Sequence, residues 1–448
     1  MKFLSDLNRS ENSFIYIVLA ILFELAMGVV MFMKLGLDAL LYLYALIPLL
    51  LLTAFLGTYA YNNDCDMRLY FALISLATTG ISLQILVDQV YHPLTTFSFL
   101  KYGIGLCVAF VFVFFYYFFR KILSRKFTVY LTLIGCTAIY VILYLYGVDP
   151  NGYGTLAWIR MGPYTVQMTD FTKVAAILFY SSLLTSDENR SVSNILWIST
   201  LFFFINLAGS VIIHELGSFF ILFFLHLSIL FIFVPRSLGK RIYLIVVLGL
   251  CVGAVVGSFI LYKSLLPMAE AGELSGLMRK AWPFIKKIYT RFSLTANLTS
   301  DPYGSGYQLL QGKKALWMSG LFGNTVNFHA IPVPESDMAF IALVNSFGLP
   351  LGVFSILMFM MILISGSTLS RNMLTKEPKD AIVIYGATIL LFLQAIIVIL
   401  GSCNMIPFAG LPIPFLSRGG TYQSIVFCFS GLLIYLSKGS WKGEAHEE

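Results

Sequence analysis

The 448-residue chain is 58% hydrophobic and only 11% charged, whereas soluble domains carry about 25% charged residues. This composition excludes a water-soluble fold, because no globular core buries so much apolar side-chain surface. The formal net charge of +7 does not by itself indicate an anionic partner such as a nucleic acid, since basic cytoplasmic loops of a membrane protein produce the same excess.

Apolar runs recur along the whole chain, each close to the roughly 20 residues that span a bilayer, and predict an all-α polytopic membrane protein of about 12 helices. The first run has no small-residue cleavage pattern behind it, so we expect a retained helix and not a cleaved signal peptide. The predicted helices cover residues 13–34, 38–60, 67–87, 100–119, 127–147, 170–186, 193–211, 213–234, 241–262, 336–366, 380–402 and 421–437. The stretch 193–234 is either two helices joined by a tight turn or one long kinked segment.

Lysine and arginine predict the orientation, because they are retained on the cytoplasmic side of a membrane. Basic clusters at 120–126, 236–241 and 371–379 alternate as twelve spans with both termini in the cytoplasm require. This topology places one long segment, residues 263–336, outside the cell. Its length is typical of a functional loop.

The first half of this external segment has the pattern of a basic amphipathic helix that lies along the membrane surface. Its basic and aromatic residues are Arg279, Lys280, Trp282, Lys286 and Lys287. Two interpretations of this charge stay open. Long loops escape the charge rule for membrane topology, or the basic residues meet phosphate.

Four motifs add a more specific signal. They read AWIRMGPYTVQMTDFTK at 157–173, DPYGSGYQLLQGKKALWMSGLFGN at 301–324, VPESDMAFIALVNSFG at 333–348 and PFAGLPIPFLSRGGT at 407–421. In this order, and with these spans between them, they resemble the motifs of the SEDS proteins (shape, elongation, division and sporulation), the group of FtsW, RodA and SpoVE. The resemblance extends from about Met67 to Leu436.

The resemblance implies a fold and an activity. The family shares a domain of ten membrane helices, here residues 67–448, which residues 1–66 extend by two N-terminal helices. Its members are peptidoglycan glycosyltransferases of the bacterial plasma membrane. They polymerise lipid II, a polyprenyl-pyrophosphate-linked disaccharide-peptide, with inversion at the anomeric carbon. The implied partners are a class B penicillin-binding protein and the surrounding membrane lipids.

Some positions depart from the family pattern. Ala157 replaces the first Arg of an Arg-Trp pair, Arg418 replaces the usual Tyr, and Asn345-Ser346 replaces two glutamates. The chain therefore resembles a divergent member, and its substrate or partner can differ from those of the family.

Asp337 is the candidate general base for the acceptor hydroxyl. It is expected where the external loop meets the outer end of a helix, and an ionisable group at that depth is a functional candidate by default. Partial desolvation would raise its pKa toward the working pH, which favours proton uptake. The alternative is a carboxylate that caps the start of the helix.

Cations are needed to stabilise the departing pyrophosphate, and the external candidates are Arg160, Arg291, Lys313, Lys314 and Arg418. Arginine offers a planar fork that matches phosphate oxygens. The alternative for each is a side chain that snorkels to lipid headgroups.

The remaining candidates for substrate binding are polar or aromatic. Glu335 binds a divalent cation, tunes Asp337 or is a solvated loop acid, so a metal cofactor stays open although the reaction needs none in principle. Lys173 lies three residues after Asp170 on one helical face, which favours a structural ion pair. Aromatic residues that would stack on sugars or join the interfacial belt, and residues that match family motifs, are Trp158, Tyr307, Gln308, Gln311, Ser417 and Gly419.

Two further functions stay open besides the glycosyltransferase. Twelve helices are also typical of a transporter, here a flippase for the lipid-linked precursor, but no repeat of two six-helix halves is visible. The departures from the motifs also permit a non-catalytic scaffold for a penicillin-binding protein.

Overall fold

The computed structural model describes residues 13–91, 97–122, 126–150, 152, 154–162, 164–186, 190–304, 306–324, 328–418 and 420–440. In this part of the chain, eight helices are long and apolar enough to cross a membrane. Shorter apolar helices accompany them at Gly105–Tyr116, Gly217–Phe233 and Gly420–Leu436. The fold is therefore that of an all-α polytopic membrane protein, as the apolar runs predict.

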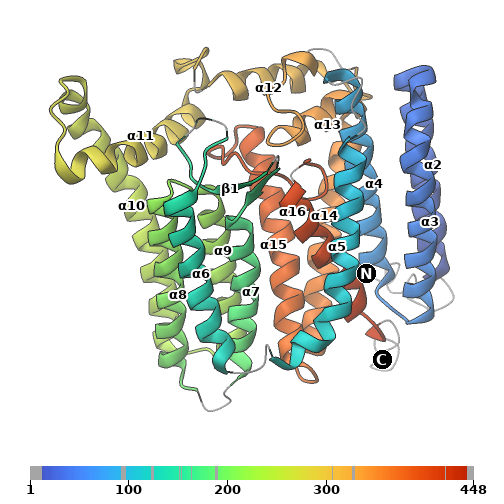
Figure 1. Cartoon of the computed structure of the whole chain (residues 1–448), viewed down its shortest axis with the longest axis horizontal. Helices are drawn as coiled ribbons and strands as arrows, with labels where there is room; N and C mark the ends of the chain where they lie inside the picture. Colours follow the sequence, from blue (N-terminus) through green and yellow to red (C-terminus); the bar gives the residue numbers. More distant parts are fainter. Residues whose placement is uncertain are drawn as a thin grey trace.

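The bundle is built from long helices that run side by side (Figure 1). They are α2 (Ser13–Leu35), α3 (Leu40–Asn62), α4 (Met67–Tyr91), α5 (Phe97–Ile122), α6 (Lys126–Tyr146), α7 (Thr169–Thr185), α8 (Val192–Ile212), α9 (Gly217–Phe233), α10 (Leu238–Glu270), α14 (Leu349–Met373), α15 (Pro378–Ser402) and α16 (Gly420–Leu436). Each predicted apolar run overlaps one of them. The stretch 193–234 forms two helices, α8 and α9, so the single kinked helix is the wrong alternative.

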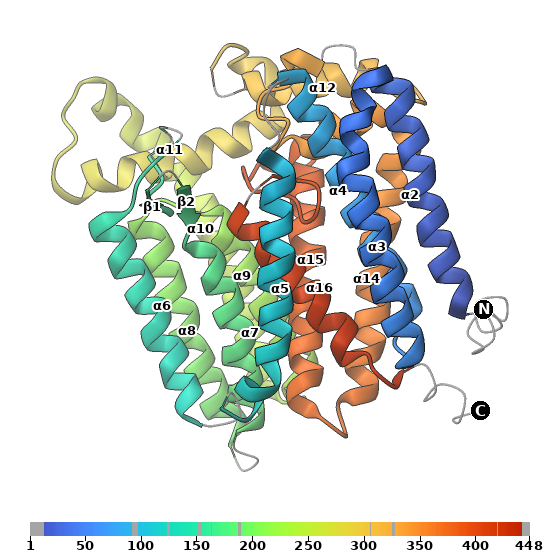
Figure 2. The ribbon, with the colours of Figure 1, turned by 45° about the vertical axis from the view of Figure 1, so that its right-hand side comes forward.

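Shorter elements cover one end of this bundle (Figures 1 and 2). These are α11 (Gly276–Ala296), α12 (Tyr307–Met318), α13 (Ala339–Phe347), and a hairpin of β1 (Trp158–Met161) and β2 (Tyr164–Gln167). The single-turn helices are η2 (Gly36–Ala39), η3 (Leu298–Ser300) and η4 (Phe328–Ala330). The predicted amphipathic helix is therefore present as α11.

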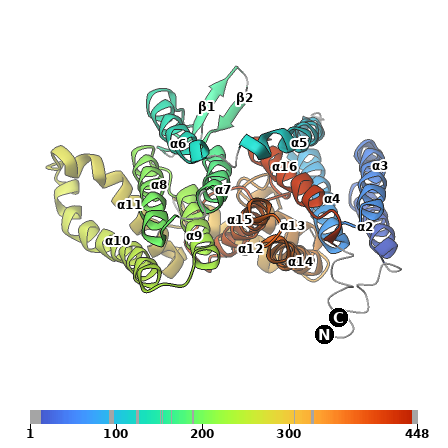
Figure 3. The same ribbon diagram turned by 90° about the horizontal axis from the view of Figure 1, so that it is seen from below.

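Seen along the bundle, α15 lies between the group of α6 to α9 and the group of α4, α5, α14 and α16 (Figure 3). The α2–α3 hairpin packs at the outer edge against α4. A buried carboxyl helps to hold it there, because Thr53 Oγ1 of α3 donates to Glu24 Oε1 of α2 at 2.5 Å. Phe23 of α2 also stacks on Phe354 of α14 at 4.9 Å between ring centroids.

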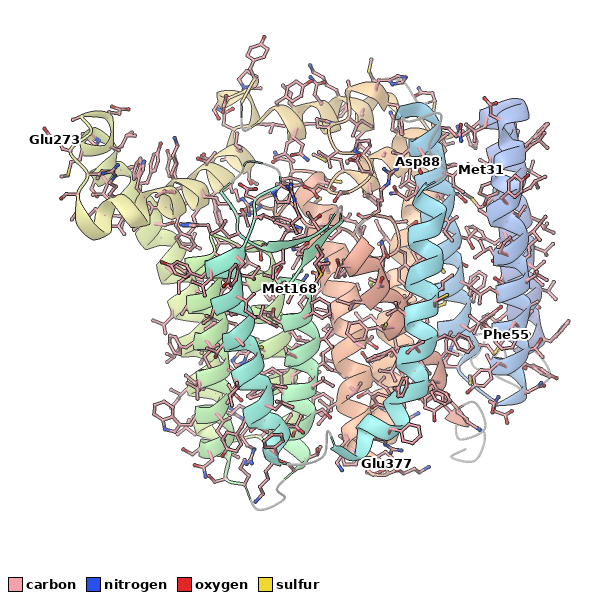
Figure 4. The ribbon with its side chains drawn as sticks, viewed as in Figure 1. Met31, Phe55, Asp88, Met168, Glu273 and Glu377 are labelled. Carbon is pink, nitrogen blue, oxygen red and sulfur yellow. The ribbon has the colours of Figure 1, made fainter. Side chains whose placement is uncertain are left out.

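The end of the bundle opposite to α11 and α12 carries Glu377, whereas Asp88 lies toward the covered end (Figure 4). Arg120 of α5 forms ion pairs there with Glu377, at 2.5 Å, and with Asp380, at 2.9 Å. The long predicted segment 263–336 and the predicted basic clusters therefore lie at different ends, as the alternation of charged loops requires.

The prediction of one continuous helix over 336–366 is wrong. The chain breaks at Gly348 into α13 and α14, since Gly348 has a φ of +93° that disfavours any residue with a Cβ. A Cβ on Gly348 would lie 2.2 Å from the backbone oxygen of Leu321. Asn345 Nδ2 donates to Ala315 O at 2.7 Å and Asn324 N donates to Asn345 O at 3.0 Å. The segment around α12 is thus attached to the break between the two helices.

Candidate functional site

A tight turn, residues 331–338, places Asp337 immediately before α13. The backbone N–H groups of Ser336 and Met338 both donate to Val333 O, at 3.1 and 3.3 Å. Helix α13 begins at Ala339 and has no side-chain cap. The carboxylate of Asp337 accepts instead from Ser336 Oγ at 2.9 Å, so the helix-cap alternative is wrong.

Backbone contacts from two distant segments hold this turn in place. Gln84 Nε2 of α4 donates to Glu335 O at 3.2 Å and to Leu416 O at 2.5 Å. Arg418 N donates to the same Glu335 O at 2.7 Å. The conformation of the turn therefore depends on α4 and on the 407–418 loop, which lie far apart in the sequence.

Ser417, a predicted substrate-binding residue, is one of these contacts. Its side chain is fully buried, its Oγ donates to Ser336 O at 2.7 Å, and it accepts from Ile413 N at 2.8 Å. Both hydrogen-bonding roles of the hydroxyl are occupied by backbone groups. Ser417 thus positions the turn, and its predicted contact with a substrate stays a prediction.

The carboxylate of Asp337 is half-buried, and one of its oxygens faces the 407–418 loop. Gly410 has a φ of +63°, and a Cβ there would lie 3.5 Å from Asp337 Oδ2. Burial raises the pKa of Asp337 above its usual value, and the charge of Glu335 adds to the rise, whereas the bond from Ser336 and the charge of Arg291 oppose it. A carboxyl with a raised pKa is suited to general-base chemistry.

Arg291 of α11 lies close enough to Asp337 for their charges to interact, and Lys287, one helical turn earlier, interacts with Arg291. Lys287 Nζ donates to Thr155 Oγ1 and to His214 O, both at 2.9 Å. Burial, reinforced by the charge of Arg291, lowers the pKa of Lys287 to about 8. Burial also lowers the pKa of Arg291, opposed by the negative charges of Glu215 and Asp337.

The α8–α9 turn supplies the balancing charge. Both carboxylate oxygens of Glu215 accept from Ser218 N at 3.2 Å, which caps α9. His214, the residue before it, has a φ of +58°. The charge of Glu215 therefore acts on both cations, and the charge of Arg291 also interacts with that of Asp337.

A pocket of about 320 Å³ opens on the other side of the Asp337 turn. Its lining residues are Val87, His329, Ile331, Pro332, Val333, Pro334, Glu335 and Arg418. Arg418 forms an ion pair with Asp88 at the covered end of α4, where Figure 4 labels Asp88. Asp337 does not line this pocket, so the turn separates the carboxylate from it.

Comparison with known proteins tests the resemblance. A family model described as a cell cycle protein family, FtsW/RodA/SpoVE, matches residues 66–441. This chain belongs to that family. The family region begins directly before α4, so α2 and α3 lie outside it.

Relatives and solved structures agree with the assignment. Stage V sporulation protein E of Bacillus subtilis is 26% identical over 317 residues, which cover 69% of this chain and 79% of that protein. The probable peptidoglycan glycosyltransferase FtsW of Enterococcus hirae is 25% identical over 302 residues, covering 63% of this chain and 68% of that protein. A chain of a peptidoglycan synthase complex superposes with a TM-score of 0.61 at 17% identity, covering 86% of this chain and 99% of that chain. The rod shape-determining protein RodA of Thermus thermophilus gives 0.53 at 15%, covering 83% and 96%.

The family motif at 157–173 places Lys173 in an internal ion pair. Lys173 Nζ donates to Asp170 Oδ1 at 2.8 Å and to Gln394 Oε1 at 3.1 Å, and both charged side chains are only 1% exposed. The predicted ion pair is confirmed. Its ammonium has almost no surface from which to contact a substrate, so the predicted substrate contact of Lys173 has no support in this geometry.

Residues on α12 and β1 form a separate set. Tyr307 and Lys313 of α12 and Arg160 of β1 are exposed, whereas the side chains of two predicted glutamines and one predicted tryptophan are half-buried: Gln308, Gln311 and Trp158. Within the described residues, no hydrogen bond or ion pair joins any of them to Asp337. Their roles stay predictions, and Gly419 lies outside the described residues.

Sequence reasoning missed three polar groups of the site: Gln84, Asp88 and Glu215. Glu215 lies in the sequence HELGS at 214–218, which joins α8 to α9. No group of three or more His, Cys, Asp or Glu side chains in the described ranges has the arrangement of a metal site. A divalent cation at Glu335 would therefore need further ligands from water or from substrate phosphates.

Proposed function

We propose that this protein is a peptidoglycan glycosyltransferase that polymerises lipid II at the outer face of the bacterial plasma membrane. The observation that carries the proposal is the half-buried carboxylate of Asp337, which a hydrogen-bonded turn holds within reach of the charge of Arg291. Relatives that are named as probable peptidoglycan glycosyltransferases support it. Both termini then lie in the cytoplasm, and α11 and α12 lie outside.

The residues suit each part of the reaction. Asp337 accepts the proton of the acceptor hydroxyl, whose oxygen attacks the anomeric carbon of the donor from the side opposite to the diphosphate. The bond from that carbon to the diphosphate oxygen breaks, and its electron pair leaves with the diphosphate. Arg291 and Lys287 stabilise this growing negative charge, since preorganised cations in a poorly solvated site act strongly.

A transpeptidase partner completes the proposal. A peptidoglycan synthase complex that couples polymerisation and crosslinking contains the structural neighbour with the TM-score of 0.61. We propose a class B penicillin-binding protein as the corresponding partner here, which would crosslink the strands that this chain polymerises.

The test uses the purified full-length chain with lipid II, alone and with its transpeptidase. Asp337→Asn should lower the polymerisation rate by about 10² to 10⁴-fold, the usual contribution of a general base. The matched control is Glu273→Gln, an exposed acid at the α10–α11 connection and far from the turn (Figure 4). Glycan strands separated on a gel provide the measurement.

Two results would overturn the proposal. One is equal polymerisation by wild type and Asp337→Asn. The other is a wild-type protein that forms no strands with any partner yet moves fluorescent lipid II across vesicles, independently of Asp337, which is the behaviour of a flippase.

A further inference from the structure

The pocket beside the catalytic turn has walls of two kinds. Ile331, Pro332, Val333 and Pro334 supply aliphatic surface, and Val87 of α4 closes it. Glu335 and Arg418 supply a carboxylate and a guanidinium. Ligand sites typically combine apolar walls with a few convergent polar groups in this way.

The charges around the pocket exclude a diphosphate as its ligand. The guanidinium of Arg418 already forms an ion pair with Asp88, and Glu335 adds a second carboxylate. Negative charge thus exceeds the charge of the one guanidinium. Two other cations, Lys287 and Arg291, do not line the pocket, and the charge of Arg291 interacts with that of Asp337.

An uncharged ligand rich in hydroxyl and amide groups fits these walls. A carboxylate accepts from hydroxyls, and the donors of Arg418 that do not face Asp88 can bond hydroxyl or carbonyl oxygens. The prolines and Val333 can pack against the apolar face of a pyranose ring and against an acyl methyl group. The volume is at the lower end of the range for small-ligand pockets, which suits a single sugar unit.

We propose that this pocket is a saccharide subsite that binds one N-acylated amino sugar of the lipid-linked substrate next to the Asp337 turn. The inference rests on the proposed function. Glu335 and Asp337 belong to the same turn, whose backbone is fixed by Gln84 and Arg418, so a sugar in the pocket is held at a set position relative to the base. Arg418 contacts the sugar, and Asp88 is a positioning residue that orients Arg418.

A photocrosslink tests the subsite without depending on activity. Val333 is 39% exposed and lines the pocket, so Val333→p-benzoyl-phenylalanine places a reactive group there. Fluorescent lipid II should crosslink to this variant and not to the same substitution at Leu374, an exposed residue at the opposite end of α14. Unlabelled lipid II should compete, and undecaprenyl diphosphate, which lacks the sugars, should not.

Two outcomes of this crosslinking experiment would overturn the inference. Absence of a crosslink at Val333 would exclude the subsite, and equal competition by undecaprenyl diphosphate would identify a phosphate site instead. The crosslink should persist in Asp337→Asn, which separates the two proposals. An inactive wild type that still crosslinks refutes only the proposed function, whereas an active wild type that does not crosslink refutes only the subsite.

A kinetic measurement checks the role of Arg418. Arg418→Tyr should raise KM for lipid II by about tenfold with little change in kcat, as expected for loss of one charge-assisted hydrogen bond to the bound ligand. Asp88→Asn should raise KM less, because Arg418 remains but is less firmly oriented. Unchanged KM in Arg418→Tyr would exclude a contact between Arg418 and the sugar.

Discussion

Asp170 and Asp337 are two carboxylates in family motifs, and each has a cation within reach of its charge. Asp170 forms a 2.8 Å ion pair with Lys173 in the interior, and neither side chain is more than 1% exposed. Asp337 is half-buried at the covered end of the bundle, where Arg291 influences its pKa. Among the described residues, no ion pair joins Asp337 to Arg291 or Lys287.

The difference separates a structural acid from the one that we propose as catalytic. The carboxylate of Asp170 has its charge matched by the partner ammonium and is closed off from any ligand by its burial. The carboxylate of Asp337 is approached by a cation without an ion pair in the described residues, and it stays partly exposed, so a substrate can reach it. The position of the cation thus matters as much as the presence of the acid.

The largest expected effect is a loss of folding stability when the buried ion pair of Asp170 and Lys173 is broken. Lys173→Met leaves the buried charge of Asp170 unmatched and should destabilise the fold by about 3–5 kcal/mol. The double variant Asp170→Asn with Lys173→Met should recover part of this loss. Thermal unfolding of the purified protein in detergent measures both, with Asp337→Asn as a control that should melt like wild type. A Lys173→Met variant that melts like wild type would contradict the comparison.

A smaller effect is expected from the cation beside Asp337. Arg291→Ala removes one preorganised cation and should lower kcat/KM by about 10²-fold. The charge of Arg291 lowers the raised pKa of Asp337, so its removal raises that pKa further. Because the base must be ionised to act, the acidic limb of the pH–rate profile should move to higher pH.

The control for this variant is Arg291→Lys, which keeps the charge and should leave the acidic limb in place. An acidic limb that does not move in Arg291→Ala would show that Asp337 is not the titrating base. The same result would also contradict the difference drawn between Asp337, which titrates, and Asp170, which is held in an ion pair.

The smallest effect concerns the alkaline limb. The pKa of Lys287 is lowered to about 8, so its positive charge is present below that pH and is lost as the pH rises through it. If Lys287 stabilises the departing diphosphate, activity should fall above about pH 8. Lys287→Arg stays charged and should extend activity to higher pH, whereas Lys286→Arg, at an exposed neighbouring position, should not. Identical alkaline limbs in all three proteins would exclude Lys287 from the site.

Hydropathy predicts the helices well, because each crossing needs its own apolar run and the runs are separated by charged or turn-forming residues. It fails at Gly348, since a glycine inside an apolar run does not lower the hydropathy. The break between α13 and α14 depends on the φ of Gly348 and on its contact with Leu321, and neither is visible in local composition. The β1–β2 hairpin is missed as well, because four-residue strands carry too little periodicity.

The candidate site is predictable where a motif or a helical spacing carries it. Asp337 follows from a family motif, Arg291 from its place among the cations of the external segment, and the pair of Asp170 and Lys173 from their spacing of three residues. Gln84 is not predictable, because its contact with Glu335 joins residues 251 positions apart. The same holds for Asp88, because its ion pair with Arg418 joins residues that lie far apart in the sequence.

The attachment at Gly348 limits how the external segment moves. Ala315 is bonded to Asn345, and Leu321 packs against Gly348. These contacts attach the half of the external segment that contains α12 to the start of α14. The half that contains α11 joins the bundle through α10, of whose apolar window only 11% is buried, and through the two hydrogen bonds of Lys287 Nζ. The two halves of the external segment are therefore attached differently, one by backbone contacts at a helix break and the other by side-chain hydrogen bonds and a helix with little buried surface.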